Sequence, residues 1–171
     1  MTRTLIITLI LLLSFSALAK VKVVSGSSAC LKEKAIAVVE FDYSEATFDK
    51  DQSYESWCGE DYEERVERST EEFIKSFNEK SKGLQINNND TNAKYRIIVK
   101  VNDCDQNMGF SCSWGQLQFK SSGVITIVEI ATNEVVCTLE VDEEKGGCDY
   151  TPVDRISECF GSIGYALAKQ K

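Results

Sequence analysis

The chain has 171 residues, and its 27 Asp and Glu against 19 Lys and Arg give a formal net charge of −8. An acidic surface repels phosphate groups, which disfavours nucleic acids and anionic lipid headgroups as partners. The sequence contains no histidine, which excludes Ser-His and Cys-His catalysis, histidine zinc sites and the commonest general base.

The N-terminal segment, residues 1–19, has the pattern of a secretory signal peptide. A positive charge precedes the apolar run 5–13, and Ala17 and Ala19 are the small residues that signal peptidase recognises. We therefore expect one mature domain, residues 20–171, that is exported to the periplasm or secreted. No cysteine directly follows the cleavage site and no later apolar run is long enough to span a bilayer, so neither a lipid anchor nor a membrane span is expected.

The first half of this domain predicts two strands and a helix. Residues 21–24 alternate in polarity as a short leading strand, and residues 35–41 are almost continuously apolar, as in an interior strand. The polar stretch 42–56 is typical of a loop. Over residues 60–80 apolar side chains recur every three or four positions, which predicts a helix with one apolar face, formed by Tyr62, Val66, Thr70, Phe73 and Phe77.

The second half predicts further strands and a closing helix. The expected strands cover residues 84–86, 95–102, 116–130 and 135–141. Apolar positions change parity along the third of these, which predicts a bulge near residues 121–123. The closing helix is expected to begin at Thr151, with the threonine as its cap and Pro152 in its first turn.

These elements predict an α+β fold with the order β-α-β-β-β-α. We expect a two-layer sandwich in which two helices cover one face of a mixed, mostly antiparallel sheet. The other sheet face should be more exposed and should carry Arg96, Lys100 and Glu140.

The string from Ala35 to Phe41, followed by Asp42-Tyr43-Ser44, together with the long hairpin and the closing helix, resembles small exported proteins of Bacteroides-type bacteria. The element order is similar to the periplasmic domain of the curli-pore assembly lipoprotein and to lipoproteins that activate peptidoglycan synthases. This resemblance implies a scaffold or partner-binding role in the cell envelope, and it carries no active-site residue. The chain departs from these lipoproteins because it lacks the lipid-accepting cysteine and contains seven other cysteines.

Seven cysteines in an exported chain predict structural disulfides. None of them forms a C-x-x-C motif, which excludes a thioredoxin-like site and a zinc ribbon. We expect Cys104 to pair with Cys112 across one loop, and Cys137 to pair with Cys148. The candidates for free or intermolecular thiols are Cys30, Cys58 and Cys159, of which Cys159 is an alternative partner for Cys148. A disulfide-linked dimer through Cys30 or Cys58 is a further hypothesis.

Several aromatic residues in or beside predicted loops form a candidate surface for a sugar or a protein partner. They are Trp57, Trp114, Tyr43, Tyr54 and Phe110. An equally good alternative is that they pack as small satellites of the core. The acidic residues between positions 60 and 72 are better explained as the solvated face of a helix than as glycosidase acids.

The leading hypothesis is an exported, non-enzymatic envelope protein that binds another protein through the exposed sheet face or the aromatic loops. The alternative is a secreted carbohydrate-binding or hydrolytic protein, which requires two carboxylates facing each other across a cleft. A third hypothesis is a thiol-based redox or metal protein. The sequence assigns no catalytic, cofactor-binding or metal-binding residue, and it does not identify the partner.

Overall fold

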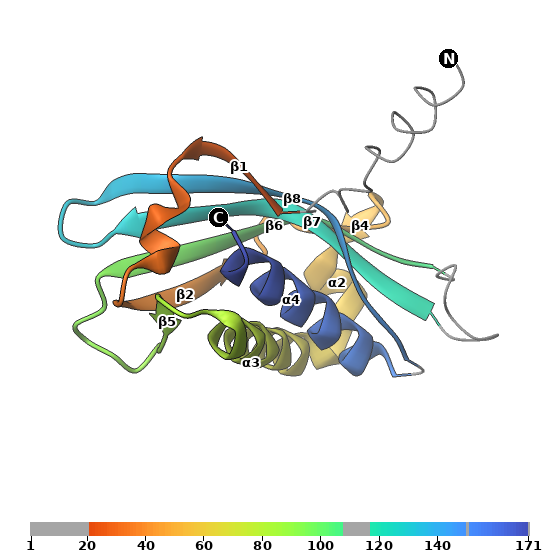
Figure 1. Ribbon diagram of the computed structural model, residues 1–171. Helices are drawn as coiled ribbons and strands as arrows, with labels where there is room; N and C mark the ends of the chain where they lie inside the picture. The colour runs from red at the N-terminus through yellow and green to blue at the C-terminus, as the bar shows by residue number, and fades with distance from the viewer. Residues whose placement is uncertain (1–20, 108–116, 150, 171) are drawn as a thin grey trace, which may run out of the picture.

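The computed structural model describes residues 21–107, 117–149 and 151–170, and these residues form one mixed sheet covered on one face by helices (Figure 1). The strands are β1 (Val21–Gly26), β2 (Ile36–Asp42), β3 (Thr47–Phe48), β4 (Gln52–Ser53), β5 (Gln85–Ile86), β6 (Tyr95–Asn107), β7 (Leu117–Glu129) and β8 (Glu134–Asp149). The helices are η1 (Ser28–Lys32), α2 (Tyr54–Cys58), η2 (Gly59–Asp61), α3 (Tyr62–Lys80) and α4 (Pro152–Ala168), with η marking 3-10 turns.

The strand order is β1-β8-β7-β6-β2-β5, with β3 added beside β6 and β4 beside β3. The pairs β1–β8, β7–β8 and β6–β7 are antiparallel, whereas β2 is parallel to both β5 and β6. The parallel pairs arise because α3 crosses over the sheet between β2 and the strands that follow it. The predicted α+β sandwich with a mixed, mostly antiparallel sheet is therefore confirmed.

The core lies between the sheet and the helices α3 and α4. Alternate residues of β6, β7 and β8 point into it, including Ile97, Ile125 and Leu139, which are fully buried. Phe73 of α3 and Phe160 of α4 are fully buried against them, each in edge-to-face contact with Phe41 of β2. Each fully buried side chain of this size contributes about 1.5–3 kcal/mol through the hydrophobic effect.

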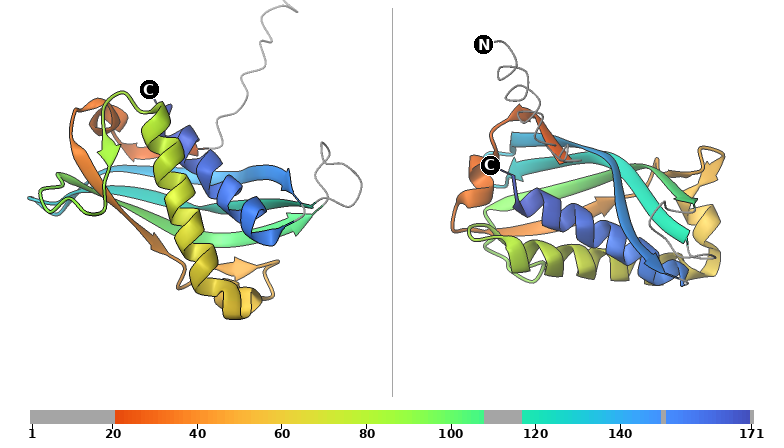
Figure 2. Two further views of the ribbon diagram at one scale, coloured as in Figure 1. Left: turned by 90° about the horizontal axis from the view of Figure 1, so that it is seen from below. Right: turned by 45° about the vertical axis from the view of Figure 1, so that its right-hand side comes forward.

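The helices α3 and α4 lie side by side across the sheet (Figure 2). They approach closely because α4 carries small residues at the contact. A Cβ atom on Gly164 would stand 2.4 Å from the carbonyl oxygen of Phe73, so only glycine fits there. The start of α4 is as predicted, since the Thr151 side chain accepts a hydrogen bond from the backbone N–H of Asp154 and Pro152 occupies the first turn.

The predicted bulge is present, because the register between β7 and β8 shifts between Ser121 and Gly123. A Cβ on Gly123 would lie 2.2 Å from the carbonyl oxygen of Lys100, which explains the glycine at this close approach of two strands. The strands run further than expected, since residues 103–107 and 142–149 pair with β7 rather than forming loops. These segments are rich in acidic residues and lack the alternation of a strand, so the sequence predicted loops. They become strands because the long strand β7 offers both of them a pairing partner.

Two further differences concern the first half of the domain. The stretch 42–56, expected as a loop, contains β3, β4 and most of α2. The buried face of α3 also begins with Arg65 and Ser69 rather than with Tyr62 and Val66, which are only partly buried. Arg65 and Ser69 are buried because α2 and the segment after β2 pack against the N-terminal half of α3 and cover these polar residues.

None of the helices in the described residues is both long enough and apolar enough to cross a membrane.

Candidate functional site

The predicted aromatic surface is only partly accessible to a ligand. Tyr54 is fully buried and Tyr43 is nearly so, and their rings stack with centroids 5.2 Å apart inside the core. Tyr54 also contacts Phe119 of β7, because α2 folds back beneath the sheet. These two tyrosines are therefore packing residues of the core, in agreement with the alternative that the aromatic residues pack rather than form a binding surface. Phe110 and Trp114 lie outside the described residues.

Trp57 has its stacking partners within the chain. Its indole lies parallel to the ring of Phe48 with centroids 3.8 Å apart, and the guanidinium carbon of Arg65 lies 4.8 Å from the ring centre. A sugar-binding tryptophan needs an open ring face on which the sugar can stack. Trp57 instead holds α2 against β3 and the start of α3, which argues against its use as a carbohydrate platform.

Two tyrosines and one cysteine of this region are held in their neutral forms. Burial raises the pKa of Tyr43, of Tyr54 and of the Cys104 thiol well above their usual values. The Cys104 sulfur lies 3.8 Å from the Ser121 hydroxyl, which opposes the shift only in part. Groups that stay protonated at neutral pH in a packed core do not supply a nucleophile or a general base.

The described cysteines bear on one of the two predicted disulfides. Cys104 and Cys137 are free, buried cysteines. Cys137 and Cys148 both belong to β8, 11 residues apart, which separates them by about 36 Å at ~3.3 Å per residue, far beyond the ~7 Å limit for a disulfide. The predicted pair between these two cysteines is therefore wrong. Cys112, the expected partner of Cys104, lies outside the described residues.

The three candidates for free or intermolecular thiols are buried. Cys30 and Cys58 are only 7% and 5% exposed, so neither lies at the surface, where a disulfide to a second chain would form. Cys159 is buried in α4, and its sulfur donates a hydrogen bond to the carbonyl oxygen of Glu144 at 3.2 Å. Among the described residues, no group of three or more Cys, Asp or Glu side chains is arranged to hold a metal ion.

The edge of the sheet at β5 is closed by side-chain amides. The backbone N–H of Ile86 donates to Asn78 Oδ1 at 2.8 Å, and Asn78 Nδ2 donates to the carbonyl oxygen of Ile86 at 2.9 Å. Where β5 ends, Asn88 continues the pairing along β2 in the same way, with bonds of 2.7 and 3.1 Å to the N–H and carbonyl of Val39. Both asparagines therefore satisfy the main-chain groups that another strand would need.

The opposite edge, at β1, is open. Within the described residues β1 pairs with β8 on one side only, and on its other side Gln170 Nε2 donates to the carbonyl oxygen of Val21 at 2.9 Å. From Lys22 to Gly26 the strand has no second neighbour in the described chain. Val23 and Val24 are 39% and 56% exposed here, and the register with β8 skips Val24. We call residues 22–26 the open edge.

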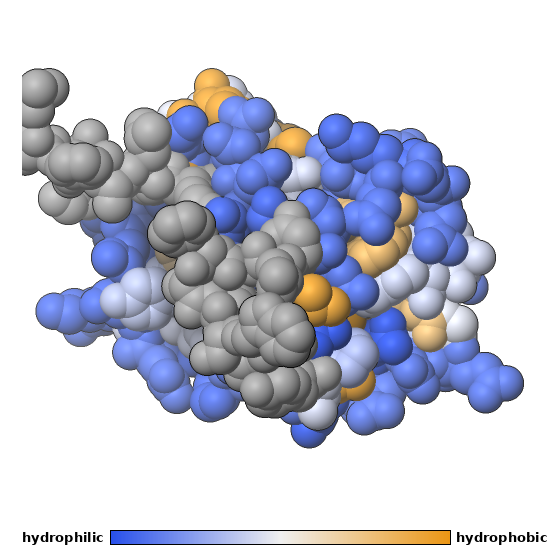
Figure 3. All heavy atoms as spheres, turned by 90° about the vertical axis from the view of Figure 1, so that its right-hand side faces the viewer, coloured by the Kyte–Doolittle hydropathy of each residue, from blue (hydrophilic) through white to orange (hydrophobic). Residues whose placement is uncertain are grey.

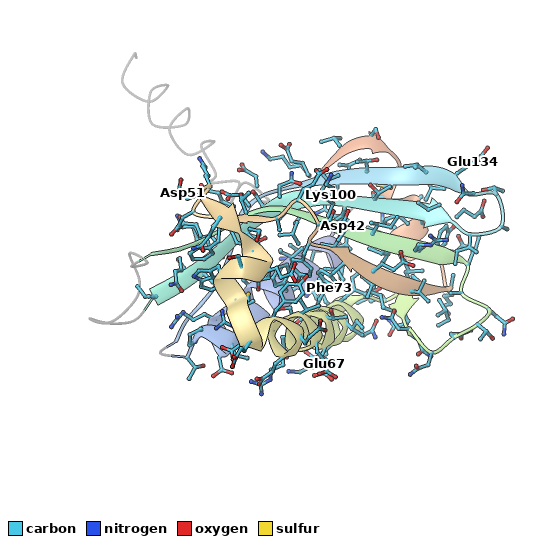
Figure 4. The ribbon with its side chains drawn as sticks, turned by 180° about the vertical axis from the view of Figure 1, so that it is seen from behind. Asp42, Asp51, Glu67, Phe73, Lys100 and Glu134 are labelled. Carbon is cyan, nitrogen blue, oxygen red and sulfur yellow. The ribbon has the colours of Figure 1, made fainter. Side chains whose placement is uncertain are left out.

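The sheet face turned away from the helices is uncovered by any described helix (Figure 1). As predicted, it carries Arg96, Lys100 and Glu140, with Lys100 and Glu140 both paired to Val124 across neighbouring strands. Asp42 of β2 lies beside Lys100 of β6, as Figure 4 shows from the opposite side of the molecule. This face is mixed in character, since charged residues alternate with partly buried valine, isoleucine and threonine.

The end of the molecule seen in Figure 3 is mostly hydrophilic among its coloured residues, with apolar side chains scattered between them. This view gives no sign of a broad apolar surface there.

The candidate functional site consists of the open edge together with the uncovered sheet face beside it. Sequence reasoning missed the open edge, because the position of β1 at the end of the sheet depends on the strand order, which has no local signature.

No protein-family model matches the chain, and no curated protein matches it. Among solved structures it is similar to the PelC dodecamer from Paraburkholderia phytofirmans, with 11% sequence identity, a TM-score of 0.47, and coverage of 85% of this chain and 96% of that chain. A variant of the same PelC dodecamer gives 12% identity, a TM-score of 0.49 and coverage of 88% and 98%. A putative neuraminyllactose-binding hemagglutinin homolog from Helicobacter pylori gives 12% identity, a TM-score of 0.34 and coverage of 84% and 86%.

Proposed function

We propose that this protein is an exported, non-enzymatic protein of the cell envelope that binds an extended segment of another envelope protein. The segment adds to the sheet as a strand along the open edge. The observation that carries the proposal is the asymmetry of the two sheet edges. Asn78 and Asn88 close one edge through four hydrogen bonds, whereas residues 22–26 have no second neighbour in the described chain.

Strand addition suits this edge for physical reasons. Main-chain hydrogen bonds give the affinity in this mode of recognition, and each contributes about 0.5–1.5 kcal/mol net. The exposed valines at positions 23 and 24 favour extended backbone and offer apolar contact to the added strand. Lys22 is the charged residue of the open edge, and a single lysine is a weak barrier against unwanted pairing.

The non-enzymatic part of the proposal is supported by the chemistry of the chain. Histidine is absent from the sequence, and the tyrosine and cysteine groups of the core are kept protonated by burial. Export is supported by the pattern of residues 1–19. The carbohydrate-binding alternative is not proposed, because Trp57 already stacks on Phe48.

The experiment is amine-directed crosslinking in intact cells of the native host, followed by mass spectrometry. Lys22 lies on the open edge, and Lys75 of α3, whose side chain is 60% exposed, serves as the reference amine on the helical side. We expect one reproducible envelope partner whose crosslinks join Lys22 in clear excess over Lys75. Recovery of the protein as a free monomer in the medium, or crosslinks confined to Lys75, would overturn the proposal.

The variant Val24→Pro tests whether main-chain pairing is the mechanism. Proline removes the N–H of a residue that has no partner on β8, so the ladder between β1 and β8 is retained while strand addition is blocked. We expect at least a tenfold loss of the partner crosslink, because several main-chain bonds are lost together. The matched control Val24→Thr keeps the N–H and the β-branched shape, and it should bind as the wild type does. Equal binding by both variants would refute strand addition at this edge.

A further inference from the structure

Two cysteines far apart in the sequence come together beside the open edge. Cys137 belongs to β8, where it is paired with Gly26 of β1. Cys30 follows four residues later in η1, and its sulfur donates a hydrogen bond to the carbonyl oxygen of Ser27 at 3.6 Å. The backbone N–H of Ser27 in turn donates to the carbonyl oxygen of Val136, the neighbour of Cys137, at 3.0 Å.

The backbone turns sharply at Gly26, which brings η1, the element that carries Cys30, against β8, the strand that carries Cys137. Gly26 has a φ of +73°, and a Cβ there would lie 3.0 Å from the Cα of Cys137. The Ser27 hydroxyl then accepts a hydrogen bond from the N–H of Ala29 and begins η1, which packs against β8. Cys137 is fully buried and Cys30 is 7% exposed, so both side chains point into the same part of the core.

The electrostatics agree with this geometry. Burial raises the pKa of the Cys30 thiol to about 11, and the neighbouring Cys137 is the second cause of the shift. Burial raises the pKa of the Cys137 thiol as well. Both groups are therefore held as thiols once the chain has folded.

Cys30 and Cys137 are free thiols in the structure. We propose that they form a disulfide while the chain folds in an oxidising compartment, a setting that rests on the export proposed above. The oxidant is a second disulfide, either that of a thiol oxidoreductase or oxidised glutathione. The thiolate of one cysteine attacks this disulfide and releases its first sulfur as a thiol, leaving a mixed disulfide. The second cysteine then attacks the mixed disulfide, so that two thiols and one disulfide become one disulfide and two thiols, and each cysteine proton ends on a released sulfur.

The step must precede complete burial, because the thiolate is the nucleophile and the folded core disfavours it. The bond would tie η1 to β8 and so fix the strand that carries the open edge, independently of whether a partner binds there. It spans 137 − 30 = 107 residues of the chain, a long loop whose closure constrains the unfolded state strongly.

The test uses the full chain, refolded with reduced and oxidised glutathione, alkylated, and digested with trypsin without reduction. The sequence makes the result unambiguous. Cys30 is the single cysteine of tryptic peptide 23–32, and Cys137 is the single cysteine of peptide 121–145. We expect these two peptides as one linked species that separates on reduction. Cys104 and Cys112 share peptide 101–120, so a bond between them would be recognised separately, by the loss of two hydrogens within one peptide.

Recovery of peptides 23–32 and 121–145 with alkylated thiols would overturn the proposal, as would a link from Cys30 to any other cysteine. A second measurement does not depend on a variant folding. Reduction of the wild-type protein should lower its Tm by on the order of 10 °C, given the length of the closed loop. In the control variant Cys104→Ser the linked species should persist, whereas Cys30→Ser should abolish both the link and the Tm response to reductant.

Discussion

At the residue scale, Arg65 shows how a charged side chain becomes part of the core. Its residue is 8% exposed, and its guanidinium lies over the Trp57 ring while Nη2 lies 2.8 Å from the carboxylate of Asp61. The aliphatic stem therefore packs while the charge keeps two favourable contacts. Arg65 also acts on its neighbour Cys58, whose pKa is raised by burial against the opposing effect of Tyr54 and of the guanidinium.

We predict that Arg65→Met lowers the free energy of unfolding by about 1–3 kcal/mol, because the substitution keeps the stem but removes the cation–π contact and the ion pair. Arg68 is the matched control one helical turn away, since its side chain is 51% exposed in a long ion pair with Asp154. Arg68→Met should change the stability by less than about 0.5 kcal/mol. Urea unfolding curves of both variants decide the matter, and equal losses would show that Arg65 has no special packing role.

At the element scale, two glycines determine how closely α3 and α4 approach. A Cβ on Gly164 would meet the backbone of Phe73 at 2.4 Å, which cannot move without shifting the whole of α3. A Cβ on Gly161 would lie 3.0 Å from the Glu72 Cγ and Ser76 Oγ atoms, whose side chains are able to rotate, and at an ordinary contact distance of 3.6 Å from the carbonyl oxygen of Glu72. Both positions are glycines of the same helix, but Gly164 faces the backbone of α3, whereas Gly161 faces mainly side chains of α3.

We predict that Gly164→Ala destabilises the protein by about 2 kcal/mol, because overpacking outweighs the gain in helix propensity. Gly161→Ala should be neutral or should stabilise the protein by up to about 1 kcal/mol, since the propensity gain remains and the contacts adjust. Thermal unfolding of both variants measures the difference. If Gly164→Ala were as stable as Gly161→Ala, the close backbone contact between the two helices would be refuted.

At the scale of the whole molecule, the chain is acidic, and several tyrosine and cysteine side chains are buried in its core. Burial raises the pKa of Tyr43, Tyr54, Cys104 and Cys30 above their usual values. These groups hold their protons in the folded state at a pH where the unfolded chain has lost them. Their contribution to stability is therefore complete below the unfolded pKa and is lost as the pH rises toward the folded one.

We predict that the fully reduced protein loses stability between pH 9, the unperturbed thiol pKa, and about pH 11, the pKa of folded Cys30. Each retained proton gives a limiting slope of about 1.4 kcal/mol per pH unit. The variant Cys30→Ala should flatten this slope when stability is measured by urea unfolding across the range. In the oxidised protein the Cys30 contribution should be absent, because a disulfide does not titrate. A stability that rises with pH in this window would contradict the assignment.

The sequence by itself determined the fold class and most of the elements. Alternation along residues 95–102 and 135–141 predicted strands with one buried face, and the parity change near Gly123 predicted the bulge. The cap at Thr151 and the placement of Lys100 and Glu140 on the uncovered face were also predicted correctly. These features are set by side chains within a few residues of one another, so the local pattern is sufficient to specify them.

Only the tertiary structure decided which distant residues meet. It placed Tyr43 and Tyr54 in the core, brought Cys30 beside β8, and closed one sheet edge with Asn78 while leaving the other open. Each of these outcomes depends on strand order and on register. A shift of one residue would turn every side chain of a strand to the opposite face. Composition and periodicity do not encode which strands become neighbours, so these contacts emerge only when the complete sheet is assembled.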